Sequence, residues 1–267
     1  MSVLIAIPAR YASTRYPGKP LVSLTGPDGV SKTLIQRSWE ATQQVAGVDR
    51  VVVATDDDRI ADAARAFGAE VVMTSESCAN GTERCADVLG RIDMRPDIVV
   101  NFQGDAPLTP PWFVEDLIAG LSADPSADVA TPVLRCDGRA LSGLRADRRA
   151  GRVGGTTAVF ARDNRALYFS KEVIPYTGGD FPADAPTPVF HHVGVYAYRP
   201  DALARYTALP AGALEKLEGL EQLRFMENGL TVKCIEVAAR GRSFWELNNP
   251  EDVARIEQML VDNGRSG

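Results

Sequence analysis

Three cations and two hydroxyl groups lie close together in the polar stretch that follows the first apolar run. Residues 3–7 are aliphatic, and the stretch that follows contains Arg10, Ser13, Thr14, Arg15 and Lys19. Fixed positive charge and backbone N–H groups at the end of a buried strand can hold a polyphosphate. A solvated basic loop would have the same composition. The position favours a ligand, because open α/β sheets bind ligands beyond the carboxyl ends of their strands.

A carboxylate follows a second apolar run in the same way. Residues 97–102 are predicted to form a buried strand, and Gln103, Gly104 and Asp105 come directly after it. A carboxylate at this position can hold Mg²⁺ through one or two protein oxygens while phosphates and water complete the coordination. A turn or helix-capping aspartate is the structural alternative.

Apolar runs alternate with helix-like segments through the first half of the chain. Strands are predicted at residues 3–7, 50–55, 69–73 and 97–102, and helices at residues 34–45, 60–67 and 81–92. The acidic residues 56–58 suit a helix N-terminus, where the helix dipole favours negative charge. This order of elements predicts an α/β protein with a doubly wound, mostly parallel sheet.

The second half of the chain is less regular. Strands are predicted at residues 129–134, 156–161, 193–198 and 232–237, with a helical turn at 163–167 and helices at 214–228 and from 250 to about 261. Residues 135–155 are polar without a clear period, and residues 175–188 are rich in Gly and Pro. We expect one domain spanning residues 1–267, with an excursion from the sheet at roughly residues 135–200.

Composition and charge exclude several classes of protein. The chain has 267 residues, 45% of them hydrophobic, and a net charge of −6. An acidic chain is poorly suited to sequence-independent binding of nucleic acid or of an anionic membrane. No segment approaches the roughly 20 apolar residues that span a bilayer. The four scattered cysteines and the lack of a signal-peptide pattern indicate reduced thiols and a cytoplasmic location.

The two histidines, His191 and His192, are adjacent and are predicted at the start of a strand. Side chains alternate along a strand, so the two rings face opposite sides and cannot bind one metal ion as neighbours. A histidine on a half-buried strand is more often structural than catalytic.

Five short motifs occur along the chain. Residues 8–15 read PARYASTR, residues 17–21 read PGKPL, residues 80–84 read NGTER, residues 192–199 read HVGVYAYR and residues 220–224 read LEQLR. Together they resemble, in kind and order, the motifs of the 3-deoxy-manno-octulosonate cytidylyltransferases. The resemblance implies a Rossmann-like nucleotidyltransferase fold with a smaller sugar-binding and dimerisation excursion, and it implies a homodimer.

The resemblance also implies a set of site residues. The implied catalytic residues are Arg10, Arg15, Lys19 and Asp105. The implied nucleotide-binding residues are Pro8, Ala9, Arg10, Ser13, Lys19, Gly81, Arg84 and Gln103. The implied sugar-binding residues are Gln103, Lys171, His192, Tyr196, Glu221 and Gln222. From periodicity alone, residues 220–224 would be a solvated face between core leucines, and Gly81 an ordinary helix start.

Three positions depart from the family pattern. Ala106 replaces an acidic residue beside the implied Mg²⁺ ligand Asp105, and Asn248 replaces an aspartate that resembles a second metal ligand. Either Asn248 or Glu246 could supply the missing oxygen, or a second ion is absent. Lys171 stands where the family often has an arginine near the substrate carboxylate, and the two side chains are not equivalent at such a site.

The implied reaction is attack of the anomeric hydroxyl of a 3-deoxy-2-ulosonic acid on the α-phosphorus of CTP, giving a CMP-sugar and pyrophosphate for surface polysaccharide synthesis. This chemistry needs positioning and charge neutralisation more than covalent help from the protein. Two alternatives remain open. The chain could transfer CMP to another acidic sugar such as a nonulosonic acid, or another nucleotide to a sugar phosphate. It could also be a catalytically weak paralogue that binds nucleotide.

Overall fold

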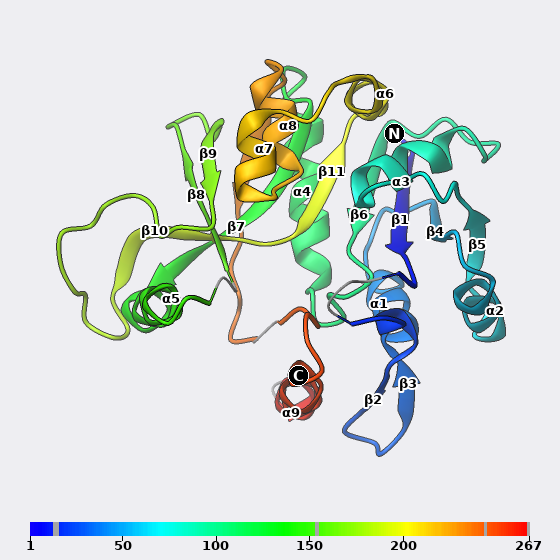
Figure 1. The fold of residues 1–267 in the computed structure, drawn as a ribbon, viewed down its shortest axis with the longest axis horizontal. Coiled ribbons are helices and arrows are strands. Elements are labelled where there is room, and N and C mark those ends of the chain that lie inside the picture. Colours follow the sequence, from blue (N-terminus) through cyan, green and yellow to red (C-terminus); the bar gives the residue numbers. More distant parts are fainter. Residues whose placement is uncertain (13–15, 153–154, 243–244, 266–267) are drawn as a thin grey trace. The chain divides into compact units, whose positions relative to one another are not determined.

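The computed structural model describes residues 1–12, 16–152, 155–242 and 245–265 of the chain (Figure 1). The chain divides into two compact units, which are described separately. Unit 1 consists of Met1–Glu115, Tyr198–Ala204 and Ala239–Gly267, and unit 2 of Asp116–Ala197 and Arg205–Ala238. Whether these units amount to one domain, as predicted from the sequence, stays a prediction.

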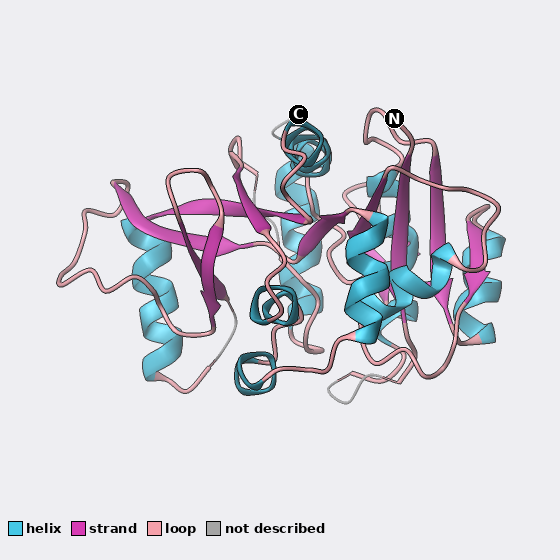
Figure 2. Cartoon of the chain, turned by 90° about the horizontal axis from the view of Figure 1, so that it is seen from above, coloured by secondary structure: helices cyan, strands magenta, loops and turns pink. Residues whose placement is uncertain are grey.

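Unit 1 is built around a parallel sheet with the strand order β5-β4-β1-β6. Its elements are β1 (Val3–Ala9), η1 (Lys19–Leu21), β2 (Ser23–Thr25), β3 (Ser31–Thr33), α1 (Leu34–Thr42), β4 (Arg50–Thr55), α2 (Asp58–Ala66), β5 (Glu70–Met73), α3 (Gly81–Leu89), β6 (Ile98–Phe102) and α9 (Asp252–Arg265). Figure 2 shows these parallel strands flanked by helices. The right-handed crossover rule puts α1 and α2 on one face of the sheet and α3 on the other.

The sequence explains why these elements begin where they do. All of β6 and residues 3–7 of β1 are buried, as expected for parallel strands covered on both faces. The side chain of Asp57 accepts a hydrogen bond from the N–H of Arg59 at 3.0 Å and caps α2, as the acidic run predicted. Asn80 caps α3 in the same way, accepting from the N–H of Glu83 at 2.8 Å.

Unit 2 contains strands in the order β11-β7-β10-β8-β9, with β12 parallel to β7. The β7–β10, β10–β8 and β8–β9 pairs are antiparallel. Its elements are β7 (Val129–Asp137), α5 (Gly138–Arg149), β8 (Thr156–Phe160), β9 (Ala166–Ser170), β10 (Pro186–His192), β11 (Val195–Tyr198), α7 (Ala213–Glu218), α8 (Gln222–Glu227) and β12 (Val232–Glu236). The helices α4 (Pro111–Ala123) and α6 (Pro200–Ala208) contribute residues to both units, and β11 ends on Tyr198 of unit 1.

The single helix predicted at residues 214–228 is wrong. Gly219 has a φ of +62°, which a right-handed helix cannot contain, so the segment forms two short helices, α7 and α8. The leucine spacing that predicted one helix is real, but the left-handed residue turns the chain before Glu221 and Gln222.

Other boundaries also differ from the predictions. The predicted helical turn at residues 163–167 is wrong, because Asn164 adopts a left-handed φ of 67° and β9 starts at Ala166. His191 and His192 end β10 instead of starting the next strand. The polar residues 135–155 contain α5, whose buried face has only Gly138 and Leu141, too few for a visible period.

The α/β class and the doubly wound, mostly parallel sheet are confirmed. All four cysteines are free thiols. Across the part of the chain that the structure describes, no helix is both long and apolar enough to cross a membrane.

Candidate functional site

The strand order of unit 1 reverses direction between β1 and β6, since β4 and β5 follow on one side of β1 and β6 pairs on the other. Open α/β sheets bind their ligands at such a switch point, outside the carboxyl ends of the strands. The loop after β1 carries Arg10 and leads to Lys19, and the loop after β6 carries Gln103 and Asp105. The predicted polyphosphate loop and the predicted Mg²⁺ loop therefore both start at the place where the topology favours a ligand.

Two of the sequence motifs, at residues 8–15 and 80–84, meet the loop after β6 at this point. A Cβ atom added to Gly81, at the first turn of α3, would lie 3.4 Å from Cγ of Pro8 and 3.6 Å from Nε2 of Gln103. A Cβ on Gly104 would lie only 2.8 Å from the carbonyl oxygen of Pro8, so this position admits only glycine without movement of the backbone. The glycines let the backbones after β1 and β6 and the N-terminus of α3 approach one another closely. The positive end of a helix dipole favours an anion or a polar base edge.

Lys19 and Asp105 are paired directly. Nζ of Lys19 lies 2.5 Å from Oδ2 of Asp105, and both side chains keep part of their surface exposed. The cation assigned to the triphosphate and the carboxylate assigned to Mg²⁺ are therefore neighbours within unit 1.

The segment before α9 is attached to the same carboxylate residue. The N–H of Leu247 donates to the backbone oxygen of Asp105 at 2.9 Å, which puts Asn248 one residue away from that contact. The N–H groups of Asn248 and Asn249 both donate to Oδ2 of Asp252, at 2.9 and 2.7 Å. Asp252 thus holds the backbone of the segment in place from the first turn of α9.

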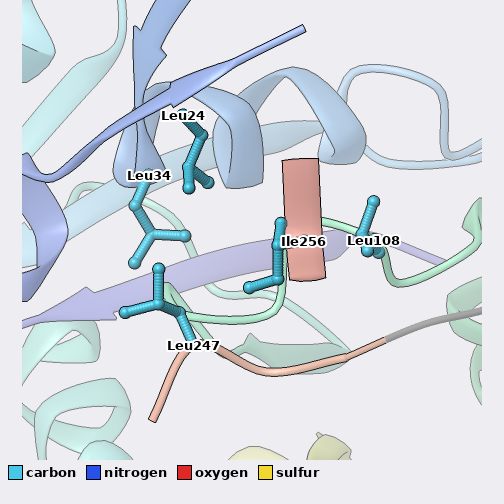
Figure 3. Close-up of a cluster of buried hydrophobic side chains, with 5 residues drawn as sticks. All are labelled: Leu24, Leu34, Leu108, Leu247 and Ile256. Carbon is cyan, nitrogen blue, oxygen red and sulfur yellow. The ribbon is translucent and has the colours of Figure 1, made fainter. Parts of the chain in front are cut away.

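A small hydrophobic cluster holds this segment against unit 1. Leu247 and Ile256 pack with three leucines from other elements, Leu24, Leu34 and Leu108, as Figure 3 shows. All five side chains are buried. The position of Asn248 beside Asp105 therefore depends on packing between residues far apart in the sequence.

The donor set near Asp105 fits a magnesium ion that the substrate completes. One carboxylate, with the amide oxygen of Asn248 or the carboxylate of Glu246 on the adjoining segment, is a small oxygen set, and Mg²⁺ usually takes one or two protein carboxylates plus phosphates and water. No group of three or more His, Cys, Asp or Glu side chains that could hold a metal by itself occurs among the described residues.

The other predicted residues of unit 1 have different surroundings. Arg10 is exposed, and its guanidinium donates to the backbone oxygen of Ala79 at 3.3 Å. Arg84 is buried, with its guanidinium 3.0 Å from Oδ2 of Asp56 and hydrogen-bonded to Thr74. Both described partners of Arg84 are protein groups at the ends of β4 and β5. Ser13 and Arg15 lie outside the described residues.

Sequence reasoning missed a buried polar group behind Gly81. The side-chain amide of Asn101 donates to the hydroxyl of Tyr198 at 3.4 Å, and that hydroxyl lies 3.0 Å from Oγ1 of Thr82. Oδ1 of Asn101 is buried and has no hydrogen-bond partner in the described structure. The available signal was a single amide residue within the apolar run of β6.

In unit 2, His192 is a buried neutral ring. Its Nε2 lies 2.8 Å from Oγ1 of Thr131, whose hydroxyl donates to the oxygen of Val195 at 2.9 Å, so the ring carries its hydrogen on Nε2. Burial, helped by the neighbouring histidine, lowers the pKa of His192 to about 3. The ring also packs edge-on against Phe169, with centroids 5.0 Å apart. His192 can orient a ligand by hydrogen bonding and cannot serve as a cation near neutral pH.

Tyr196 and Gln222 form the second part of the sugar-side set. The hydroxyl of Tyr196 donates to Oε1 of Gln222 at 3.0 Å, and the rings of Tyr196 and His192 lie 5.6 Å apart. Nε2 of Gln222 is buried without a hydrogen-bond partner in the described structure. A buried donor left unpaired costs about 1–3 kcal/mol, so this amide is a candidate donor to a bound sugar hydroxyl.

Lys171 reaches the turn between α7 and α8. Its Nζ would lie 3.0 Å from a Cβ added to Gly219, two residues before Glu221. Lys171, Glu221 and Gln222 are therefore associated with one turn of unit 2, although Lys171 comes from the end of β9. Gln103, the other residue implied to bind sugar, belongs to unit 1.

A parallel sheet with close-packed glycines, a lysine and a carboxylate at its switch point is typical of α/β nucleotide-binding enzymes. Comparison with known proteins narrows the class. The cytidylyltransferase family profile matches residues 4–235. The chain is 46% identical to the 3-deoxy-manno-octulosonate cytidylyltransferase of Maricaulis maris, covering 99% of both chains. It is 42% identical to the enzyme of the same name from Syntrophotalea carbinolica, over 97% of this chain and 99% of the other.

A solved structure gives the same result. The structure of CMP:2-keto-3-deoxy-manno-octonic acid synthetase complexed with CTP matches with a TM-score of 0.82 and 35% identity, covering 98% of this chain and 100% of the other. The chain belongs to the cytidylyltransferase family, and within it to the 3-deoxy-manno-octulosonate cytidylyltransferases.

Proposed function

We propose that the chain transfers the CMP group of CTP to the anomeric hydroxyl of 3-deoxy-manno-octulosonate (Kdo), releasing pyrophosphate. The observation that carries the proposal is the meeting of Pro8, Gly81 and Gln103 at the switch point of the sheet, close to the Lys19–Asp105 pair. Similar proteins along the full chain are named for this transfer, and one is described in complex with CTP.

In this proposal the first loop of unit 1 binds the triphosphate. Lys19, Arg10 and Arg15 neutralise its charge and that of the departing pyrophosphate, while Ser13 and loop N–H groups add hydrogen bonds. The hydrogen bond from Nζ of Lys19 to Oδ2 of Asp105 at 2.5 Å orients the ammonium that would bind the phosphates. The N-terminus of α3, at Gly81, and the side chain of Gln103, directly after β6, would contact the nucleotide.

Asp105, with Asn248 or Glu246, would hold Mg²⁺ in the complex with CTP. A bound Mg²⁺ supplies charge neutralisation at the α-phosphate and lowers the pKa of the attacking sugar hydroxyl. The hydrogen bond from the N–H of Leu247 to the backbone oxygen of Asp105 would hold the segment with Asn248 and Glu246 close to Asp105. The pairing of Lys19 with Asp105 limits the negative charge there before the ion binds.

Unit 2 is proposed to bind the sugar. The neutral His192, the hydroxyl of Tyr196 and the amide of Gln222 suit the hydroxyl groups of Kdo, because all three are hydrogen-bonding groups without charge near neutral pH. Glu221 would add an acceptor, and Lys171 would pair with the sugar carboxylate. We also propose that the enzyme acts in the cytoplasm as a homodimer and supplies surface polysaccharide synthesis.

The test is turnover with a matrix of substrates. CTP, UTP, ATP and GTP are each combined with Kdo, a nonulosonic acid and a sugar phosphate in the presence of Mg²⁺. Pyrophosphate release is followed, and the product mass is measured. We expect CMP-Kdo from CTP and Kdo, at a rate well above every other pair. A higher rate with another sugar would replace Kdo as the substrate. Binding of CTP with no turnover on any sugar would indicate a nucleotide-binding paralogue.

A further inference from the structure

The backbone of Lys171 is held on both sides of its Cα atom by charged side chains. Its N–H donates to Oε2 of Glu218 at 2.8 Å. Its carbonyl oxygen accepts a hydrogen bond from Nε of Arg148. Hydrogen bonds in which one partner is ionised are roughly twice as strong as neutral ones, so this residue is more firmly placed than an ordinary strand end.

Glu218, the last residue of α7, hydrogen-bonds two residues of β9 and the residue that follows the strand. Besides Lys171, it accepts from the hydroxyl of Ser170 at 2.7 Å and from the hydroxyl of Tyr168 at 3.3 Å. Ser170 in turn accepts from the N–H of Glu172 at 3.0 Å, which extends the network past Lys171. One half-buried carboxylate therefore organises the chain on both sides of the lysine.

Arg148 holds the opposite side from the last turn of α5. Its guanidinium donates to three backbone oxygens, those of Lys171, Arg152 and Gly155. The five donors of a guanidinium lie in a fixed plane, so this set of bonds fixes the carbonyl of Lys171 relative to the residues before β8.

These contacts fix the backbone from which the Lys171 side chain extends. Nζ of Lys171 would lie 3.0 Å from a Cβ added to Gly219. That glycine ends α7, directly after Glu218, and precedes Glu221 and Gln222 of the sugar-side set. A lysine ammonium is a point charge on four rotatable carbons, so unlike an arginine it brings no built-in orientation to a carboxylate.

We infer that Glu218 and Arg148 are positioning residues that hold the Lys171 ammonium in place for the carboxylate of the acidic sugar. This inference rests on the proposed function. Glu218 and Arg148 together form a clamp on the backbone of Lys171. This clamp supplies the orientation that an arginine would supply through its planar head group. The clamp affects the binding of the sugar and not the binding of CTP.

A double-mutant cycle tests the inference. The variants are Glu218→Gln, Lys171→Met and the double variant, with KM measured separately for Kdo and for CTP. We expect Glu218→Gln alone to raise KM for Kdo at least about tenfold, because it weakens hydrogen bonds to a charged group. KM for CTP stays unchanged. In the Lys171→Met background the same substitution changes KM for Kdo less than about twofold, since the ammonium that it places is gone.

Glu236→Gln is the matched control, because it removes a carboxylate of unit 2 whose ion-pair partner among the described residues is Arg135, which is not one of the sugar-side residues. Its KM for Kdo equals that of the wild type.

Equal effects of Glu218→Gln in the wild-type and Lys171→Met backgrounds would overturn the inference and leave the proposed function intact. A rise in KM for both Kdo and CTP would do the same. A wild-type enzyme that makes no CMP-Kdo would overturn both.

Arg148→Lys covers the case in which Glu218→Gln does not fold, as judged by circular dichroism. It keeps the charge of the side chain and loses the planar set of donors. The clamp requires the same selective rise in KM for Kdo and the same dependence on Lys171, and an unchanged KM for Kdo would overturn it.

Discussion

At the scale of single residues, Asp105 is proposed to combine two tasks that conflict in electrostatic terms. Its carboxylate pairs with Lys19 at 2.5 Å, and it is also the carboxylate that we propose as the Mg²⁺ ligand, on a residue whose backbone contacts Leu247 beside Asn248. In the proposed mechanism the triphosphate would offer Lys19 a second anionic partner, and Asp105 would then be available to hold the ion.

Asp105→Asn removes the charge and keeps the shape. We expect CMP transfer to fall at least about 100-fold, since a bound metal contributes several kcal/mol of charge stabilisation in the transition state. Asp124→Asn is the control, because Asp124 is paired with Lys233 at 2.7 Å and has similar exposure, 29% against 25% for Asp105. Pyrophosphate release at saturating Mg²⁺ measures both variants. If Asp105→Asn keeps more than half of the wild-type rate, Asp105 is not the metal ligand.

His192 makes stability depend on pH. Burial lowers the pKa of His192 to about 3. His192 of the unfolded chain therefore takes up a proton near pH 6.5, whereas His192 of the folded chain stays neutral until about pH 3. The free energy of unfolding decreases as the pH falls from about 6.5 toward 3. Burial and the charge of Arg148 lower the pKa of His191 to about 4, so His191 also makes the folded protein less stable as the pH falls. Urea unfolding of wild type and His192→Gln from pH 7.5 to 4.5 isolates the His192 contribution.

The expected difference is about 1.4 kcal/mol for each pH unit below about 6, with the wild type losing more stability than His192→Gln. His191 is present in both proteins and cancels. Parallel pH profiles for the two proteins would show that His192 takes up a proton in the folded state.

At the scale of elements, the site of unit 1 depends on α9, which contributes no predicted site residue. Leu247 and Ile256 are fully buried with leucines of β2, α1 and the loop after β6 (Figure 3). We expect Leu247→Ala to destabilise the protein by about 2–5 kcal/mol, the usual range for a buried leucine in a well-packed cluster. Leu217→Ala, at a leucine that is 82% exposed, should cost less than about 0.5 kcal/mol. Urea unfolding compares the two, and similar values would contradict the packing described.

At the scale of the whole molecule, an acidic protein must bind an acidic nucleotide through a local group of cations. The net charge is −6, so long-range attraction does not favour CTP. Because the overall charge does not attract nucleotides, their binding must come from specific contacts in the site. We expect CTP with Mg²⁺ to stabilise the folded protein and GTP with Mg²⁺ not to do so. At 100 times its dissociation constant, CTP should stabilise the folded state by about 2.7 kcal/mol and raise the thermal midpoint by about 5 °C. Equal shifts with GTP would contradict the proposed cytidine site.

Local patterns predicted the parallel half of the fold correctly. Strands β1, β4, β5 and β6 are continuous apolar runs, and the helices between them start at the polar caps Thr33, Asp57 and Asn80. Local patterns failed where one residue or distant packing decides the outcome. Gly219 splits the predicted helix at residues 214–228. Helix α4 was not predicted, although its buried residues Phe113, Val114, Leu117 and Leu121 recur at helical spacing.

The sequence by itself determined the family and the residues that could meet a triphosphate, because those motifs are short stretches whose chemistry does not depend on distant packing. Only the tertiary structure decided which of them are neighbours. It paired Lys19 with Asp105, put Gly81 against Pro8 and Gln103, and enclosed the guanidinium of Arg84 between protein partners. It also joined Lys171 to Glu218 and Arg148. These contacts link residues that strand order and side-chain packing bring close, and no local pattern encodes that proximity.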